Sequence, residues 1–195
     1  MHHHTPSPTP FPTPSLLSFL FSFAFLAVFS FSASAQDRLM TRDGSVSFFS
    51  STPVEDIEAH SEALVALLNP ETGEIAFQVP IRSFHFEKAL MEEHFNENYL
   101  ESNKFPKATF TGTIKNWEAV KAGTATAIAE GTLNCHGIAV DRTVEGSLVN
   151  VEGTWALDAA FDIAPDAHEI AIPKLVRNKI AENISVRVRA ELKAS

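Results

Sequence analysis

The sequence predicts a mainly β protein, an antiparallel barrel or sandwich of about eight short strands with two short helices. Two observations support this fold class. Apolar and polar residues alternate with a period of two along much of the chain, and turn-forming residues separate the alternating runs. Because successive side chains of a strand point to opposite faces, each run predicts a strand with one apolar face and one polar face.

The run near the carboxyl end is the clearest of these strands. In NISVRVRAELK, residues 183–193, the apolar residues 184, 186, 188, 190 and 192 alternate with polar or charged residues. Similar runs lie at residues 73–81, 131–137 and 153–163, and others follow Gly44, Lys107, Gly123 and Asp141.

Turn residues divide these runs. The stretch NPETG, residues 69–73, is typical of a hairpin turn. Four glycines mark further breaks in the second half, namely Gly123, Gly137, Gly146 and Gly153. Residues 56–69 contain good helix formers, but they also alternate and run directly into the hairpin turn, which favours a strand. Its predicted inner face consists of Ile57, Ala59, Ala63, Val65 and Leu67.

Two segments have helical patterns. In residues 88–102, a spacing of 100° per residue separates an apolar face from an acidic one. The first face carries Leu90, Met91, His94, Phe95 and Tyr99, and the second carries Glu92, Glu93, Asn96 and Glu97. The second segment is residues 173–183, where Pro173 suits a first helical turn and the apolar side consists of Leu175, Val176 and Ile180.

The amino end is typical of a secretory signal. Residues 1–35 contain no Lys, Arg, Asp or Glu, and an apolar run from Leu16 to Phe31 precedes Ala33-Ser34-Ala35. Small residues at these positions fit a cleavage site before Gln36. A membrane helix is the alternative, but the run is shorter than the ~20 residues that span a bilayer. We expect a signal peptide at 1–35 and one periplasmic or secreted domain at 36–195, with no membrane span in the mature chain.

Charge excludes one class of partner. Residues 55–101 hold eleven acidic and two basic residues, a net charge of −9, and the rest of the chain balances at thirteen against thirteen. Nucleic acid is therefore not an expected partner, because phosphate binding needs a basic surface. Cys135 is the only cysteine, so no internal disulfide is possible. We interpret Cys135 as a small buried apolar residue.

No catalytic or metal-binding motif stands out. The five histidines of the predicted mature chain lack metal-site spacing, and no nucleophile elbow, phosphate loop or dinucleotide fingerprint is present. Cys135 and His136 are neighbours in a strand and should point to opposite faces, which argues against a catalytic pair. We expect no enzyme activity, catalytic residue, metal or cofactor.

Three stretches resemble the YceI-like family. FHFEKALMEEHFNENYLESNKFPKATFTGTI (84–114) is similar to its signature, through Met91, His94, Phe95, Tyr99, Ser102, Lys104, Phe105, Pro106, Ala108, Thr109, Phe110 and Gly112. GTLNCHGI (131–138) resembles a family strand, although Cys135 replaces the usual aliphatic residue and Asn134 the usual threonine. Residues 161–188 resemble its carboxyl end. The resemblance implies an exported, eight-stranded, antiparallel lipocalin-like barrel that binds an amphiphilic lipid, such as a polyisoprenoid or an isoprenoid quinone.

Ten residues are the candidate ligand-binding set, because they lie on inferred inner faces or on the covering helix. They are Phe77, Val79, Leu90, Phe95, Phe110, Ile114, Leu133, Trp155, Leu157 and Phe161. Two alternatives stay open. One is a stress-related structural or partner-binding protein with a filled barrel and an acidic interaction surface at 55–101. The other is a metal-assisted enzyme around His85 and His94. A homodimer is also left open.

Overall fold

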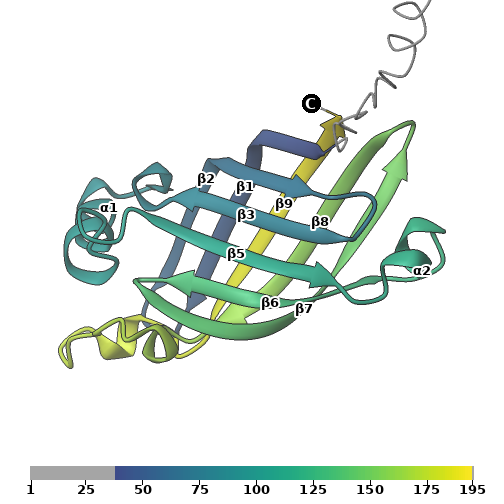
Figure 1. Ribbon diagram of the computed structural model, residues 1–195. Coiled ribbons are helices and arrows are strands. Elements are labelled where there is room, and N and C mark those ends of the chain that lie inside the picture. Colours follow the sequence, from purple (N-terminus) through teal and green to yellow (C-terminus); the bar gives the residue numbers. More distant parts are fainter. Residues whose placement is uncertain (1–37, 195) are drawn as a thin grey trace, which may run out of the picture. The chain divides into compact units, whose positions relative to one another are not determined.

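The strands follow one another around a barrel nearly in chain order (Figure 1). The computed structural model describes residues 38–194, so the predicted signal peptide and its cleavage site lie outside the described residues. The strands are β1 (Leu39–Ser51), β2 (Asp56–Leu68), β3 (Glu74–Pro80), β4 (His85–Phe86), β5 (Lys107–Ile114), β6 (Ala127–Cys135), β7 (Ile138–Val151), β8 (Thr154–Ile163) and β9 (Ile184–Ala194).

Eight of these strands close into an antiparallel ring. The order is β1, β9, β8, β7, β6, β5, β3, β2, and β2 pairs again with β1. The two-residue strand β4 lies outside the ring and pairs with Ala59 and His60 of β2. The ring confirms the predicted eight-stranded antiparallel barrel and excludes the sandwich.

The ring is not fully paired between β7 and β8. Their pairing runs from Val151 and Thr154 at the hairpin to Gly146 and Ala159. Beyond that point β7 pairs only with β6, and β8 pairs only with β9. One half of the barrel wall therefore has a gap in its hydrogen-bonded ladder.

The predicted inner face of β9 is confirmed. Val186, Ala190 and Leu192 are buried, whereas Arg187 and Arg189 point outward to Asp158 of β8, where Arg187 donates two hydrogen bonds of 2.9 and 2.6 Å. The outer face is therefore held by charged pairs and the inner face by apolar packing.

The predicted inner face of β2 is wrong in its second half. Leu64, Ala66 and Leu68 are the buried residues there, in place of the predicted Ala63, Val65 and Leu67. The pairing with β1 contains a bulge at this point. From Gly44 to Val46, a step of two residues on β1 corresponds to a step of three residues on β2, from Leu64 to Ser61. One extra residue on β2 reverses the phase of every later side chain.

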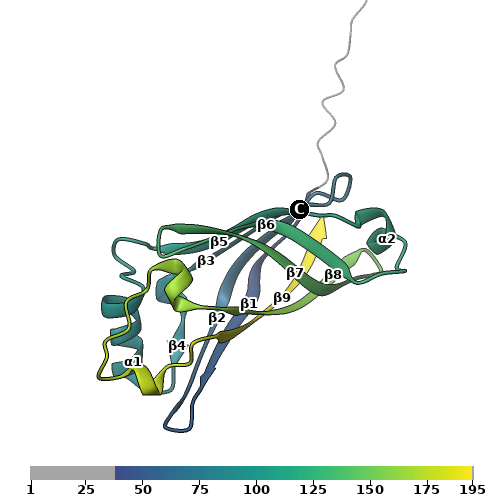
Figure 2. The same cartoon turned by 90° about the horizontal axis from the view of Figure 1, so that it is seen from below.

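The first predicted helix is present and lies at one end of the barrel. It consists of α1 (Ala89–His94) and a π-helical turn, η2 (Phe95–Tyr99). A second helix, α2 (Trp117–Lys121), lies at the opposite end, within the β5–β6 connection (Figure 2). Five residues are too few for a helical period to be visible in the sequence, so α2 was not predicted.

The prediction of a second helix at residues 173–183 is wrong. The segment contains only the three-residue 3₁₀ turn η4 (Arg177–Lys179) and otherwise irregular backbone. Short helices have little stability of their own and depend on packing. Here Ile172, Val176 and Ile180 face the barrel interior from an irregular segment. Two further 3₁₀ turns are η1 (Ile81–Ser83) and η3 (Pro165–His168).

Glycines act as predicted at two hairpins and differently at a third position. Gly137 and Gly153 have φ angles of +78° and +88° and form the β6–β7 and β7–β8 turns. Gly146 instead lies inside β7, where a Cβ atom would be 2.8 Å from the Cβ of Ala159. This glycine permits a close approach of β7 and β8 at the last pair before they separate.

Candidate functional site

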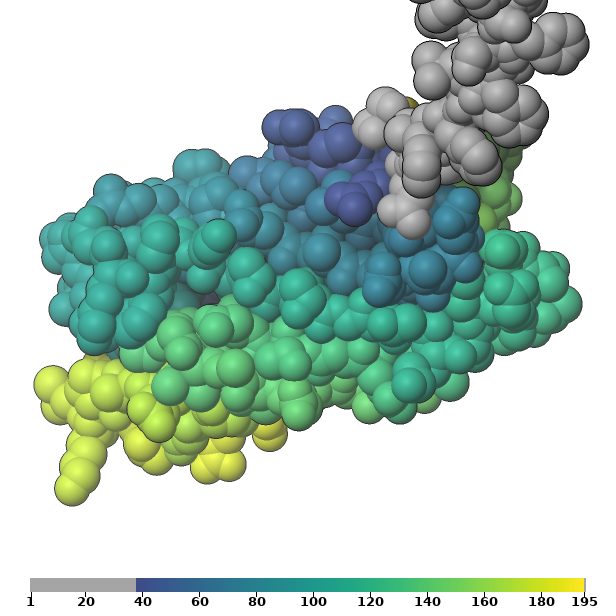
Figure 3. Space-filling model, viewed as in Figure 1, coloured from purple at the N-terminus to yellow at the C-terminus, as the bar shows by residue number. Residues whose placement is uncertain are grey.

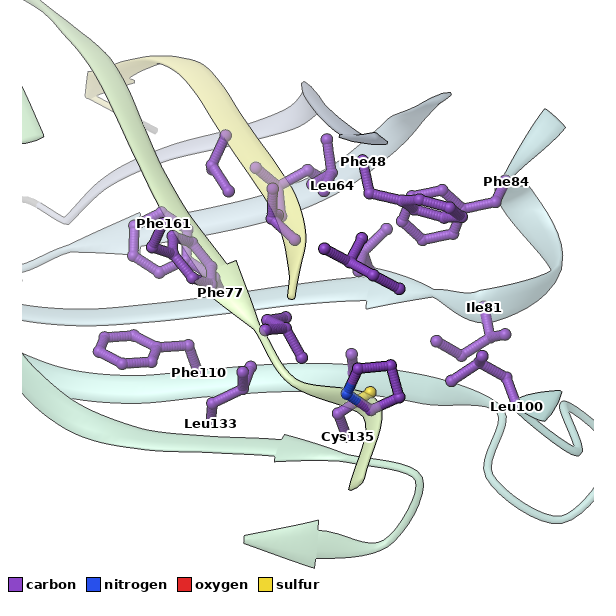
Figure 4. Close-up of a pocket in the computed structure, with 18 of the residues that line it drawn as sticks. Phe48, Leu64, Phe77, Ile81, Phe84, Leu100, Phe110, Leu133, Cys135 and Phe161 are labelled. Carbon is purple, nitrogen blue, oxygen red and sulfur yellow. The ribbon is translucent and has the colours of Figure 1, made fainter. Parts of the chain in front are cut away.

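The barrel encloses a large apolar cavity. Its volume is about 590 Å³, within the range of about 300–1,000 Å³ that is usual for small-molecule sites. Figure 4 shows Phe77, Phe110, Leu133 and Phe161 around one part of it, whereas Phe48 and Phe84 lie farther along. The interior is hollow, so the alternative of a filled barrel does not describe this structure.

Nine of the ten residues predicted to contact a ligand line this cavity. They are Phe77, Val79, Leu90, Phe95, Phe110, Ile114, Leu133, Leu157 and Phe161. Trp155 is not among the lining residues. The geometry brings the nine side chains around one space, and their contact with a ligand stays a prediction.

Trp155 instead helps to close one end of the barrel. Its ring centroid lies 5.2 Å from that of Trp117 in α2. Trp117 is 5% exposed and its Nε1 donates a 3.1 Å hydrogen bond to the Pro70 carbonyl. Gly73 has a φ of +73° and passes so close to Trp117 that a Cβ atom would be 2.7 Å away. The hairpin at 69–73 and α2 thus form a packed end wall.

The other end is covered by the helix that sequence analysis predicted. Leu90, Met91, His94, Phe95 and Tyr99, its predicted apolar face, all line the cavity. In the space-filling view a hollow lies between the teal atoms of this segment and the green strands (Figure 3). We call this end the mouth; it is formed by α1, η2 and residues 170–180.

Aromatic rings pack together beneath the helix. The ring centroid of Phe95 lies 5.5 Å from that of Phe48, 5.7 Å from Phe84 and 5.0 Å from Phe86. These distances are typical of aromatic pairs that add to the apolar contact itself. The first turn of η2 is therefore held to β1 and β4 through ring contacts.

The acidic face of the helix differs from the prediction at Glu92 and Asn96, which are both half-buried. Glu93 and Glu97 are exposed, as expected. Glu92 is half-buried, and its Oε2 accepts a 3.2 Å hydrogen bond from the backbone N–H of Phe86. Glu92 therefore joins α1 to β4. The helical pattern of apolar and polar residues cannot predict this hydrogen bond, because it gives only the face on which a residue lies.

Three charged residues line the mouth as one cluster. Glu55, in the β1–β2 turn, lies 3.1 Å from Lys88 Nζ and 3.6 Å from Lys179 Nζ. The hydrogen bond from Lys88 is the main cause that lowers the pKa of Glu55. The cluster joins the β1–β2 turn, the residue before α1 and η4, which are far apart in the sequence.

None of the four charged residues that line the cavity, Glu55, Lys88, Arg142 and Lys179, was predicted from the sequence. Arg142 of β7 lines the cavity, and its Nη1 donates a 2.6 Å hydrogen bond to the Asp162 carbonyl of β8. Alternation along β7 could have placed Arg142 on the inner face, because Val144 and Leu148, which are two and six residues further along the strand, also line the cavity. Arg142 thus bridges the two strands where their backbone pairing has ended.

Cys135 and His136 lie on opposite sides of the wall, as predicted. Cys135 is 8% exposed and lines the cavity, and burial raises the pKa of its thiol to about 11. The His136 ring lies outside, 3.1 Å from the His168 carbonyl and 3.0 Å from Glu101 Oε2. The two side chains do not form a nucleophile–base pair.

No metal or membrane-spanning element is found in the part of the chain that the structure describes. Among residues 38–194, no group of three or more His, Cys, Asp or Glu side chains could hold a metal ion. Within the same residues, no helix is long and apolar enough to cross a bilayer.

Comparison with known proteins identifies relatives of the fold. The model of the YceI-like domain matches residues 31–192. No curated protein sequence matched the chain. A polyisoprenoid-binding domain from Saccharophagus degradans, described as implicated in plant cell wall breakdown, has a TM-score of 0.71 at 15% identity. That match covers 82% of this chain and 99% of the domain.

Two further solved structures have the same fold. BcnA from Burkholderia cenocepacia gives a TM-score of 0.67 at 17% identity, over 77% of this chain and 96% of its own. A YceI protein from Campylobacter jejuni gives 0.55 at 15% identity, over 68% and 82%. At these identities the structures establish the fold, and the domain match over most of the sequence establishes the family. The chain belongs to the YceI-like family.

Proposed function

We propose that this protein is an exported, non-enzymatic carrier that holds an isoprenoid-type amphiphile, a polyisoprenoid or an isoprenoid quinone, in its barrel. The cavity of about 590 Å³ is the observation that supports this most directly, since apolar side chains from all eight strands of the ring and from α1 line it. Burying a lipid chain there contributes about 0.8 kcal/mol per methylene, so tight binding needs no special chemistry.

The shape of the cavity favours a long ligand over a compact one. Along β8 the lining runs from Leu157 to Ile163, a distance of roughly 20 Å at the rise of an extended strand. The Trp117–Trp155 pair closes one end of the cavity, and the apolar face of α1 and η2 covers the other end. The Saccharophagus domain with the same fold is described as polyisoprenoid-binding, which supports the same ligand class here.

Extraction of the purified protein with organic solvent, followed by mass spectrometry, tests this function. We expect an isoprenoid lipid in the extract at a stoichiometric level. Phe77→Glu places a charge in the cavity and should abolish the signal, because an unpaired charge in an apolar space is costly. Thr111→Glu, an exposed position on β5, is the matched control. An empty extract from the wild type, or equal extracts from both variants, contradicts the proposal.

Export is tested separately. The apolar run and Ala33-Ser34-Ala35 predict a mature chain that begins at Gln36. Amino-terminal sequencing of the protein recovered outside the cytoplasm should start at that residue. Recovery of residues 16–31 in a membrane fraction would instead show that the run is retained.

A further inference from the structure

Arg142 brings a cation to a cavity wall that is otherwise mostly apolar. The other residues with a full charge that line the cavity are Glu55, Lys88 and Lys179, which form the paired cluster at the mouth. Arg142 is not part of the ion pairs of that cluster and lies on β7, where it pairs with Gly131 of β6. The guanidinium is therefore a separate polar feature of the wall.

The bonds that Arg142 makes leave its charge without a counter-charge. Its Nη1 donates to a backbone carbonyl, that of Asp162, at 2.6 Å. Its Nε is buried and makes no hydrogen bond within residues 38–194, and no carboxylate of those residues forms a salt bridge with it. A guanidinium has five N–H donors arranged to meet two oxygens at once, so a large part of this capacity is unused.

The positive charge of Arg142 also affects the neighbouring His168. The pKa of the fully buried His168 is lowered, first by burial and further by the positive charge of Arg142. The positive charge of Arg142 therefore acts on a neighbouring buried group. Keeping an uncompensated charge beside an apolar space costs free energy, and an oxygen anion placed there would recover it.

We propose that Arg142 binds the anionic head group of the amphiphile, a carboxylate or a phosphate, at the gap between β7 and β8. The inference rests on the proposed lipid-binding function, adds the position of the head group, and narrows the ligand to an anionic isoprenoid lipid, which excludes the neutral isoprenoid quinone. The lipid chain then occupies the apolar space between Arg142 and the tryptophan pair. The purely structural alternative is that Arg142 only joins β7 to β8 through Asp162.

Chain-matched lipids separate these roles. Phytanic acid, phytanyl phosphate and phytanol share one branched isoprenoid chain and differ in the head group. Their affinities are measured by displacement of the neutral dye Nile red, at a pH where the acid is ionised. We expect the wild type to prefer both anions over the alcohol by about tenfold or more, the usual value of a hydrogen bond to a charged group. The two anions distinguish carboxylate from phosphate recognition.

Variants assign the preference to a residue. Arg142→Gln keeps a donor for the Asp162 carbonyl and loses the charge, so it should bind phytanol normally and lose the preference for anions. Arg142→Lys should retain part of it. Lys179→Met removes one positive charge from the mouth cluster and tests that cluster as the rival head-group position; whatever its effect on the three absolute affinities, it should keep the preference for anions. Thermal unfolding and circular dichroism verify that each variant folds.

Three other results would contradict either the head-group proposal or the lipid-binding function. Equal wild-type affinities for the three lipids overturn the proposal while leaving the lipid-binding function intact, and this comparison needs no variant. A preference that survives Arg142→Gln but disappears in Lys179→Met places the head group at the mouth and also overturns it. If none of the three lipids displaces the dye, the proposed function itself fails.

Discussion

Phe95 joins the covering helix to the barrel through ring contacts. Its ring lies 5.0 to 5.7 Å from those of Phe86, Phe48 and Phe84, and it also lines the cavity. A ligand in the cavity would therefore meet Phe95 directly and meet the other rings in positions that Phe95 maintains.

Phe95→Ala should weaken lipid binding by about tenfold or more, because one buried apolar side chain is worth more than the ~1.4 kcal/mol that this requires. Glu93→Gln, on the exposed side of the same helix, is the control and should change the affinity little. Both are measured by dye displacement. A larger effect of Glu93 than of Phe95 would mean that the acidic face contacts a partner instead.

Cys135 provides a pH-dependent prediction. Burial raises the pKa of its thiol to about 11, so at about pH 8 roughly one thiol in a thousand is ionised. Labelling of the native protein should therefore be slow and should accelerate about tenfold per pH unit up to about pH 10. The urea-unfolded chain is the control and should react quickly at about pH 8. Equally fast labelling of the native protein would show that the thiol is accessible and activated.

At the scale of the elements, the mouth depends on contacts between segments that are distant in the chain. Glu55 contacts both Lys88 before α1 and Lys179 in η4. Its pKa is lowered, chiefly by the hydrogen bond from Lys88, so this carboxylate is ionised at neutral pH. The stabilisation is present above the unfolded-state pKa and is lost as the pH falls through the lowered folded-state value.

Glu55→Gln should accelerate the release of bound lipid and leave the melting temperature nearly unchanged, since exposed ion pairs contribute little to global stability. Stopped-flow displacement measures the release rate. Glu58→Gln, an exposed change of equal charge on β2, should release lipid like the wild type. Identical rates for the two variants would show that the cluster does not restrain the mouth. Lowering the pH below the folded-state pKa of Glu55 should reproduce the faster release in the wild type.

At the scale of the whole molecule, the barrel is packed at one end and hollow beyond it. Trp155 is 6% exposed and packs on Trp117, whereas Leu157, two residues later on the same strand, borders the cavity. Truncation costs most where neighbouring atoms surround the side chain on every side. The two positions therefore differ in what their side chains contribute.

Trp155→Ala should lower the free energy of unfolding by about 3–5 kcal/mol, the usual cost for a packed tryptophan. Leu157→Ala should cost clearly less, because part of its surface already faces an empty volume, but it should weaken lipid binding. Urea unfolding and dye displacement measure the two quantities. The opposite ranking of stabilities would mean that the tryptophan pair does not support the end wall.

The fold class, the helix over the mouth and most of the cavity wall could be predicted from the amino-acid sequence. These features depend on local periodicity, because one apolar face per strand and one per helix must turn inward. That is why Phe77, Phe110 and Phe161, predicted from alternation, line the cavity. Where the alternation of apolar and polar residues is regular, it assigns a side chain to the inner or outer face of its strand, and the partner strand need not be known.

The other features of the site depend on tertiary contacts. The bulge opposite Gly44 reversed the inner face of β2, because register depends on the partner strand. Trp155 became part of an end wall through α2, and residues 173–183 became irregular at the mouth. Arg142 acquired its position because β7 and β8 separate after Gly146 and Ala159. Each of these outcomes depends on contacts between segments far apart in the chain, and such contacts leave no trace in a local pattern of apolar and polar residues.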